Sequence, residues 1–272
     1  MNGSFCRAVT CILVLTCWGR LQAQESCLDG RYQFTTKALE KNVELIDKCL
    51  AFSRGEVLDE CVDWRGEKYC WAPAKVGWHR WSSGMATQLQ RKKKTVQGRF
   101  CIVVDKAGYE MSLYEGGELI ETWPMDLGDN PFDDRVAGGR ECTPEGLFAV
   151  EYKGWTRYHE ALLIAHPNVA AKKRHRQLRK KGAIDHGIGQ WLEIHGNDYP
   201  EERSNWTDGC VALADEFMDQ LYGHMGLPAR KALEKAKGKS RRKLRKAVAR
   251  IERQTLLAVV KYARPESKYC MQ

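Results

Sequence analysis

Two stretches of sequence say most about the fold and chemistry of this chain: WTDGCVAL at residues 206–213 and the shorter IHG at residues 194–196. The cysteine of the first stretch, Cys210, comes fifteen residues after the histidine of the second, His195. A thiol with an ordinary pKa of about 8.5 is only a few per cent thiolate at neutral pH, and a nearby imidazole can take its proton. The two stretches therefore predict a cysteine nucleophile with a histidine as its general base. A buried structural cysteine and an unrelated core histidine would give the same spacing.

The residues just before Cys210 are candidates for the rest of such a site. Gly209 has no side chain, so the backbone there can approach a substrate closely, and the amides of Gly209 and Cys210 are candidates for an oxyanion hole. Asp208 either orients His195 or bonds to nearby backbone as a loop residue, and we favour the second interpretation. Weaker candidates for substrate contact are Trp206, Thr207 and Asp208.

Upstream of His195, apolar residues recur in short segments of strand type. Gly116 and Gly117 separate the second segment from the third and predict a β-hairpin. Several short strands separated by turn signals predict a mainly β domain, closed as a sandwich or barrel. The segments are residues 100–104, 109–114, 118–123, 147–152, 162–165 and 191–195.

Helices are expected on both sides of this β region. Residues 35–53 carry apolar side chains at helical spacing, and the Cys-, Trp- and Gly-rich stretch after them is interpreted as a small disulfide-tied cap. A helix is predicted over residues 215–222, with Asp215 as its N-cap. Residues 228–264 predict a basic helix, either one long helix or two broken at Gly238.

The first 23 residues have the pattern of an export signal. A basic residue precedes an apolar run at residues 8–18, and the small residue Ala23 precedes the expected cleavage site. At about 1.5 Å per residue, this run is too short to cross a hydrocarbon core of roughly 30 Å as a helix. Lipid attachment at Cys17 is the less favoured alternative. The pattern predicts an exported protein of the periplasm or cell envelope.

The chain contains 11 cysteines, three of which lie within the expected signal. Export places the others in an oxidising compartment, where disulfides form. Four cysteines ahead of the β region are a plausible two-bridge set, and the sequence leaves their pairing open. A zinc site is disfavoured because these cysteines have no tight paired spacing and no pair of histidines beside them. The four are Cys27, Cys49, Cys61 and Cys70.

The net charge of +9 is concentrated near the end of the chain. Residues 229–264 contain fourteen Lys and Arg but only two Glu. A dense basic segment is typical of nucleic-acid binding, but export argues against nucleic acid as the partner. Two alternatives stay open: attraction to anionic cell-wall polymers or membrane headgroups, and a solvated helix packed on the domain.

The order of these motifs resembles the catalytic domain of the L,D-transpeptidase (YkuD) family. His-Gly followed by Thr-x-Gly-Cys resembles the active-site signature of that family, and LIAHPN at residues 163–168 is similar to its YafK-like branch. The resemblance runs in order from residue 100 to residue 222, and it implies a YkuD-like β-sandwich or barrel with helical N-terminal and C-terminal extensions. Further matching stretches are IVVD, LY, GDNP and TPEG, at residues 102–105, 113–114, 128–131 and 143–146.

Residue by residue, the resemblance implies Cys210 as the nucleophile, His195 as the general base and Gly196 as the backbone neighbour that helps to orient the base. Two positions depart from the family pattern. Most members have His where this chain has Asp208, and many have Arg where it has Ala212. That Arg is commonly given a substrate-positioning role, so its loss puts the contact to a substrate carboxylate in doubt.

The function implied by the resemblance is that of a peptidoglycan L,D-transpeptidase, in which the cysteine forms a thioester with a stem peptide and an acceptor amine resolves it. A thiol, an imidazole and an oxyanion hole suffice for this chemistry, so no metal or organic cofactor is expected. Two alternatives are kept. Water would resolve the same thioester in an L,D-carboxypeptidase or amidase, and a non-catalytic protein would bind the cell wall through its basic tail.

The expected layout has four parts along the chain. A signal peptide covers residues 1–23, and a Cys-rich helical region follows at residues 24–97. The catalytic domain is expected over residues 98–223, and a basic helical tail over residues 224–272.

Overall fold

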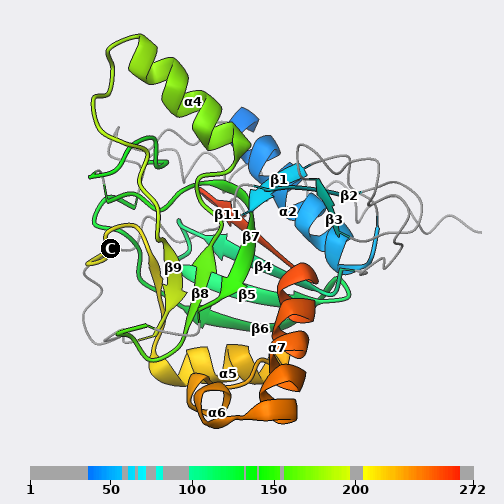
Figure 1. Ribbon diagram of the computed structural model, residues 1–272. Helices are drawn as coiled ribbons and strands as arrows, with labels where there is room; N and C mark the ends of the chain where they lie inside the picture. The colour runs from blue at the N-terminus through cyan, green and yellow to red at the C-terminus, as the bar shows by residue number, and fades with distance from the viewer. Residues whose placement is uncertain are drawn as a thin grey trace, which may run out of the picture.

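The computed structural model (Figure 1) describes residues 36–56, 61–64, 67–71, 78–81, 98–131, 133–139, 141–153, 156–196 and 205–263. Its main feature is an eight-stranded mixed sheet with the strand order β10-β9-β8-β7-β11-β4-β5-β6. Two neighbouring pairs, β10 with β9 and β11 with β4, are parallel, and the other neighbours are antiparallel. The expected mainly β fold with flanking helices is confirmed.

The strands of this sheet follow the predicted segments closely, with two additions, at residues 211–212 and 255–260. The hairpin at Gly116 and Gly117 is confirmed, and both glycines have positive φ angles. The strands are β4 (Phe100–Asp105), β5 (Glu110–Glu115), β6 (Glu118–Pro124), β7 (Gly146–Tyr152), β8 (Ala161–Ile164), β9 (Glu193–His195), β10 (Val211–Ala212) and β11 (Thr255–Val260). A separate antiparallel sheet contains β1 (Cys61–Trp64), β2 (Glu67–Trp71) and β3 (Trp78–Trp81).

The two central strands, β4 and β11, are buried along their whole length. Alternate side chains of a strand point to opposite faces, so each strand contributes to two clusters of apolar residues. Ile102 and Leu257 belong to the cluster on one face, and Val103 and Leu256 belong to the cluster on the other. The near-continuous apolar sequences FCIVVD and TLLAVV are what burial on both faces requires.

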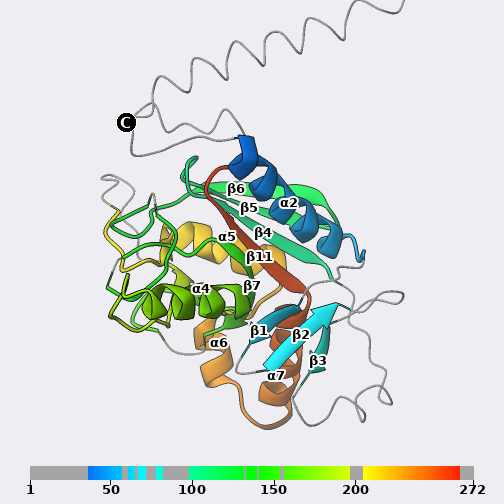
Figure 2. The ribbon, with the colours of Figure 1, turned by 90° about the horizontal axis from the view of Figure 1, so that it is seen from above.

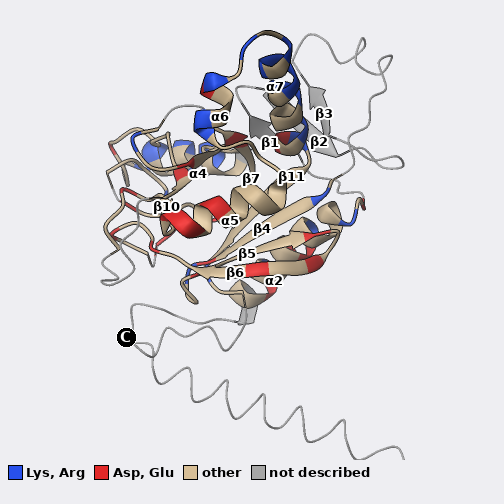
Figure 3. Ribbon diagram, turned by 90° about the horizontal axis from the view of Figure 1, so that it is seen from below, with Lys and Arg blue, Asp and Glu red and all other residues tan. Residues whose placement is uncertain are grey.

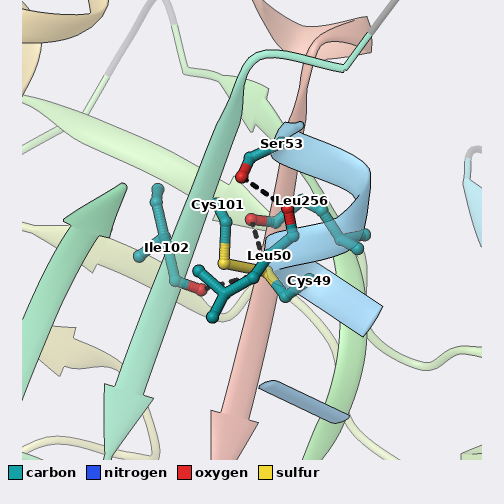
Figure 4. The surroundings of a disulfide bond; sticks show 6 residues. All are labelled: Cys49, Leu50, Ser53, Cys101, Ile102 and Leu256. Carbon is teal, nitrogen blue, oxygen red and sulfur yellow. Dashed lines mark hydrogen bonds between the residues drawn. A yellow bond between two sulfur atoms is a disulfide. The ribbon is translucent and has the colours of Figure 1, made fainter. Parts of the chain in front are cut away.

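Helix α2 (Thr36–Ser53) covers one face of the sheet, where it lies against β11 and β4 (Figure 2). Phe52 is fully buried there, and a disulfide joins Cys49 of the helix to Cys101 of β4 (Figure 4). The expectation that Cys49 pairs with Cys27, Cys61 or Cys70 is therefore wrong. Packing of the helix on the sheet brings two cysteines together that are 52 residues apart in the sequence.

The opposite face is covered by helices that follow β10 in the chain (Figure 1). Helix α5 (Asp215–Met225) buries Met218 and Leu221 in the cluster that contains Ile102. Its N-cap residue is Ala214, so the prediction of Asp215 as the cap is wrong. Asp215 instead lies in the first turn, 3.7 Å from Nδ1 of His159. The other helices are α4 (Val169–Lys180), α6 (Arg230–Lys235) and α7 (Gly238–Arg253).

The C-terminal region differs from the expected helical tail. Two basic helices, α6 and α7, are present, but the second ends at Arg253. Residues Thr255–Val260 then form β11, which lies between β7 and β4 in the sheet. The prediction of helix beyond residue 254 is wrong, and the sheet extends past residue 223, where the catalytic domain was expected to end.

Several expectations fall on residues outside the described part of the chain. These include the export signal at residues 1–23 and Cys27. In the described residues, no helix has the length and apolar character needed to span a bilayer. The backbone register of the small sheet sets Cys61 opposite Cys70.

Candidate active site

Five of the seven sequence-predicted residues meet at one cavity of about 800 Å³ at the β9–β10 edge of the large sheet. His195 comes from β9, and Cys210 directly precedes β10. Trp206, Thr207 and Asp208 line the same cavity, as expected of substrate-contact candidates, whereas Gly196 and Gly209 are not among its lining residues. The arrangement brings a thiol and an imidazole to one concave surface.

The strand register explains why these two side chains share a face. In the parallel β9–β10 pair, Val211 is opposite Ile194, and both belong to the apolar core. Side chains alternate along a strand, so Cys210, Glu193 and His195 all lie on the other face. The amide of Glu193 lies 3.4 Å from Sγ of Cys210 and donates to it. The cysteine is thus fixed against β9 before any substrate binds.

The His195 ring is fully buried and held in one orientation. Nδ1 lies 2.6 Å from the carbonyl oxygen of Gly196, so Nδ1 carries the proton and donates it. Tyr158 stacks on the ring at 4.0 Å between centroids, and Trp206 contacts it edge-on at 5.8 Å. The other nitrogen, Nε2, is buried and has no hydrogen-bond partner among the described residues. Nε2 is therefore available as a base.

Burial keeps both groups of the pair neutral. Desolvation lowers the pKa of His195 to about 4, with smaller contributions in the same direction from Lys153 and Arg157. Desolvation also raises the pKa of the partly buried Cys210 thiol to about 11, against the opposing effect of the Glu193 amide. At neutral pH the pair is thiol and imidazole, not thiolate and imidazolium. The arrangement suits proton transfer during nucleophilic attack.

The loop before Cys210 is held by backbone contacts. The Thr207 hydroxyl donates to the carbonyl of Cys210 at 2.9 Å and accepts from the amide of Gly209 at 3.2 Å. Gly209 has a φ of +107°, and a Cβ there would lie 2.5 Å from both Nη1 of Arg135 and the carbonyl oxygen of Cys142. Only glycine fits this position without displacing its neighbours.

Gly196 has a similar steric requirement. A Cβ at this position would lie 2.6 Å from Oδ1 of Asp215 and 2.8 Å from Cβ of His159. Its carbonyl is the acceptor that orients His195. Asp208 does not occupy that orienting position. Its own backbone carbonyl accepts a hydrogen bond from the Arg135 side chain at 2.7 Å. The expected bond from the Asp208 side chain to nearby backbone stays a prediction.

The cavity is also lined by residues that the sequence did not reveal, among them Tyr158, Glu193 and Arg135. Glu193 is buried and forms an ion pair with Lys153. Arg135 lies in the long loop between β6 and β7 and is only 6% exposed. Because side chains alternate along a strand, the sequence of β9 could have predicted that Glu193 lies on the same face as His195. No local sequence pattern could have predicted Arg135, because its hydrogen-bond partners lie up to 73 residues later in the sequence.

In the described residues, no group of three or more His, Cys, Asp and Glu side chains is arranged to hold a metal ion.

Comparison with protein families gives one match that covers half of the chain. A family model for the L,D-transpeptidase catalytic domain, YkuD, matches residues 99–236, which include the cavity residues Cys210 and His195. No curated protein sequence gives a significant match.

Three solved structures with partial similarity share 11–17% sequence identity with the chain. Pgp2, the helical cell shape determining protein of Campylobacter jejuni, matches at 15% identity and TM-score 0.38, over 59% of this chain and 47% of its own. Bd1075 of Bdellovibrio bacteriovorus matches at 17% identity and TM-score 0.38, over 61% of this chain and 49% of its own. The L,D-transpeptidase LdtMt1 in complex with imipenem matches at 11% identity and TM-score 0.33, over 60% of each chain. The chain spans about half the length of the first two.

Proposed function

The chain belongs to the L,D-transpeptidase catalytic-domain family, YkuD, and on that premise we propose that it is a peptidoglycan L,D-transpeptidase with Cys210 as its nucleophile. One observation carries the assignment of the nucleophile and base. The unpartnered, buried Nε2 of His195 and the Cys210 thiol line the same cavity, on the same face of neighbouring strands. The sequence-predicted roles of Cys210 and His195 are kept in this proposal.

The first half of the reaction is acyl transfer to the enzyme. Sγ of Cys210 attacks the carbonyl carbon of the third, diamino-acid residue of a donor stem peptide, while its proton passes to Nε2 of His195. The Cys210 amide is the oxyanion donor in this scheme, because the Gly209 amide already donates to Thr207. The C–N bond then breaks, His195 returns the proton to the leaving nitrogen, and the terminal D-Ala departs. A thioester on Cys210 is left.

The second half resolves the thioester. The amine of an acceptor stem peptide attacks the thioester carbonyl, and Nε2 of His195 takes the proton that this nitrogen loses. The C–S bond breaks, and the sulfur recovers the proton from His195. Because Nδ1 donates to Gly196 throughout, the ring keeps one orientation while Nε2 alternates between base and acid.

The cavity has the size and lining that a peptide substrate needs. Its volume of about 800 Å³ lies within the range of ligand pockets, roughly 300 to 1,000 Å³. Trp206 and Tyr158 provide aromatic walls, and Arg135 provides a positive charge. Water as the resolving nucleophile would make the same site an L,D-carboxypeptidase. The acyl-enzyme is common to both.

We include contact with an anionic wall polymer or membrane surface through the basic helices α6 and α7 in the proposal. In the ribbon of Figure 3, much of these two helices is coloured as Lys and Arg. In α7, Val248 and Ile251 are buried, which leaves the basic residues to face solvent. An envelope location follows from the activity of the family and agrees with the expected export signal.

The experiment that tests the proposed function uses the purified protein and defined muropeptides, with products identified by mass spectrometry. Crosslinked or amine-exchanged products indicate transfer, and shortened stems alone indicate hydrolysis. Cys210→Ala should abolish both, while Cys142→Ala serves as the matched control at a cysteine buried elsewhere. If wild type and Cys210→Ala both leave every stem peptide unchanged and yet both bind to purified sacculi, the protein is a wall-binding module instead.

A further inference from the structure

Trp191 is an exposed aromatic residue at the cavity that contains Cys210. It is 66% exposed, whereas the next residue along the chain, Leu192, is only 2% exposed. Trp206, which contacts the ring of His195, lines the same cavity and is 38% exposed. Two large apolar rings are therefore open to solvent beside the proposed nucleophile.

The backbone of Trp191 has a conformation that bulky residues rarely adopt. Its φ angle is +69°, in the left-handed region that favours glycine. In the described part of the chain, only three other non-glycine residues have positive φ angles, and one of them, Glu141, lines the same cavity. Another, Asn205, directly precedes Trp206. Strained residues of this kind cluster at ligand sites, where the surrounding structure holds them in place.

Hydrogen bonds on both sides of Trp191 hold its backbone. The amide of Ile164 on β8 donates to the carbonyl oxygen of Leu192 at 2.7 Å. On the other side, the amide of Gly138 donates to the carbonyl oxygen of Gly187 at 2.6 Å. The strained conformation is thus fixed, and it leaves the ring uncovered. This is the arrangement of a binding surface for a ligand with an apolar face.

The chain between Trp191 and the thiol limits the distance between them. The amide nitrogen of Glu193 lies 3.4 Å from Sγ of Cys210, and Trp191 is two residues before Glu193. Two residues span at most about 7 Å, so the Cα of Trp191 lies within about 10 Å of the sulfur. The three stem residues that end at the scissile carbonyl also span about 10 Å when extended. The group to which the stem peptide is attached can therefore reach the Trp191 ring.

We propose that the Trp191 ring stacks on the sugar that carries the donor stem peptide, so that the site recognises the glycan as well as the peptide. One face of a pyranose presents C–H groups, which pack on the negative face of an aromatic ring. Stem residues are small or charged, so the sugar is the part of the substrate with an apolar face of matching size. Gln190 and Glu141, at the same cavity, offer hydrogen-bonding groups to its hydroxyl and N-acetyl groups. The proposal rests on the proposed function and adds the glycan to its substrate.

Two ligands separate the sugar from the peptide. One is the free donor tetrapeptide, and the other is the muropeptide in which the same tetrapeptide is attached to its disaccharide. Binding of each is measured by calorimetry to the full chain carrying Cys210→Ala, so that no turnover occurs. The ratio of the two dissociation constants reports the contribution of the sugar.

We expect the muropeptide to bind about 5- to 30-fold more tightly than the free tetrapeptide, the range for covering one aromatic ring. Adding Trp191→Gly should abolish this preference and leave the affinity for the free tetrapeptide unchanged. Glycine suits the positive φ angle, so this variant removes the ring without straining the backbone. Trp191→Phe should retain part of the preference, because a smaller ring covers less area. Leu119→Ala, which removes an exposed apolar side chain of β6, is the control and should change neither affinity.

Three results would overturn the proposal. In the first, Trp191→Gly weakens the muropeptide and the free tetrapeptide by the same factor, so that the ring contacts the peptide or supports the cavity. In the second, Trp191→Gly keeps the full preference for the muropeptide. In the third, the protein with Trp191 binds the two ligands equally or binds neither. Failure of the proposed function is a separate result, namely that wild-type protein turns over neither ligand, and it does not alter the ratio of the two dissociation constants.

Discussion

At the scale of single residues, the proposed nucleophile and base are both neutral groups. His195 and Cys210 are each desolvated, one with a lowered pKa and the other with a raised pKa. An ion pair of thiolate and imidazolium is therefore not the resting state at neutral pH. The base has to act while the sulfur attacks, so the pH dependence of acylation should report His195 directly.

The first prediction is that the acid limb of the kcat/KM profile lies near pH 4. Because the pKa of His195 is lowered to about 4, its imidazole is deprotonated and competent as a base above that pH, and it is lost as a base when the pH falls below it. His195→Ala should lower the acylation rate by roughly 10² to 10⁴. The measurement is kcat/KM for a stem peptide across pH. An acid limb near the ordinary histidine value of about 6.5 would contradict the description of a desolvated base.

The residues of the site differ in how far the sequence could reveal them. Cys210 and His195 were found because their motif lies in two short local stretches. The expectation that the Asp208 side chain bonds to nearby backbone stays a prediction, because the hydrogen bond observed at Asp208 joins its backbone carbonyl to Arg135, 73 residues away in the sequence. Arg135 and Tyr158 reach the cavity from loops whose paths depend on the whole sheet. No local pattern encodes that path.

At the scale of elements, helix α2 is held to the sheet by apolar contacts and by one covalent bond. Phe52 is fully buried, and Cys49 is bonded to Cys101 with 5.5 Å between the Cα atoms. A disulfide limits the freedom of the unfolded chain, and a loop of this length gives a stabilisation of about 4 kcal/mol in the chain-entropy model. The helix thus depends on an oxidising environment for part of its stability.

We therefore predict that Cys49→Ala/Cys101→Ala lowers the free energy of unfolding by about 2 to 4 kcal/mol. Urea unfolding followed by circular dichroism measures this. Treatment of the wild type with a thiol reductant should produce a similar loss, and the double variant serves as the control that the reductant no longer affects. Equal stability of wild type and variant would mean that the bond contributes nothing.

Helix α7 has exposed basic residues on the side away from the core, among them Arg242, Lys243 and Lys246. We predict that Arg242→Glu/Lys243→Glu/Lys246→Glu weakens retention on purified sacculi without changing turnover of a soluble stem peptide. The attraction should also fade as salt shortens the Debye length from about 10 Å at 0.1 M to about 3 Å at 1 M. A cosedimentation assay across salt concentrations tests this, and retention indifferent to both charge and salt would assign α7 a structural role.

Substitution is the suitable design for that test, because the chain continues from α7 into β11. Truncation before α7 would remove a central strand together with the charges. The strand was overlooked in the sequence because the basic helical pattern continues up to it. The apolar run TLLAVV was a usable strand signal, since a short continuous apolar segment is typical of a strand buried on both faces.

At the scale of the whole molecule, the sheet joins distant parts of the chain. β11, near the C-terminal end of the described residues, pairs in parallel with β4 and antiparallel with β7. The sequence predicted most strands, but not their order, because pairing between distant strands is decided by tertiary packing. The Cys49–Cys101 bond escaped prediction for the same reason.

Two buried histidines make the stability of the fold sensitive to acid. Desolvation lowers the pKa of both His166 and His195 to about 4. In the unfolded chain each would titrate near 6.5, so the unfolded state binds more protons at acidic pH. Their contribution to stability is fully present above about pH 6.5 and is lost as the pH falls to about 4.

We predict a loss of about 3 kcal/mol per histidine between neutral pH and pH 4, in addition to the effects of other groups. Urea unfolding at about pH 7.5 and about pH 4.5 should show this decrease. His166→Gln, which cannot titrate, should have a smaller difference between the two pH values. If the difference is the same in this variant, His166 is not buried in its neutral form.

The acyl-enzyme on Cys210 tests the central claim most directly. Wild-type protein and Cys210→Ala are each incubated with a donor stem tetrapeptide, quenched in acid and examined by intact-protein mass spectrometry and peptide mapping. If Cys210 is the nucleophile, wild type gains the mass of the tripeptide acyl group at Cys210, hydroxylamine removes it as expected of a thioester, and Cys210→Ala gains nothing. An equal adduct on both proteins, or turnover of the peptide by Cys210→Ala, would contradict it.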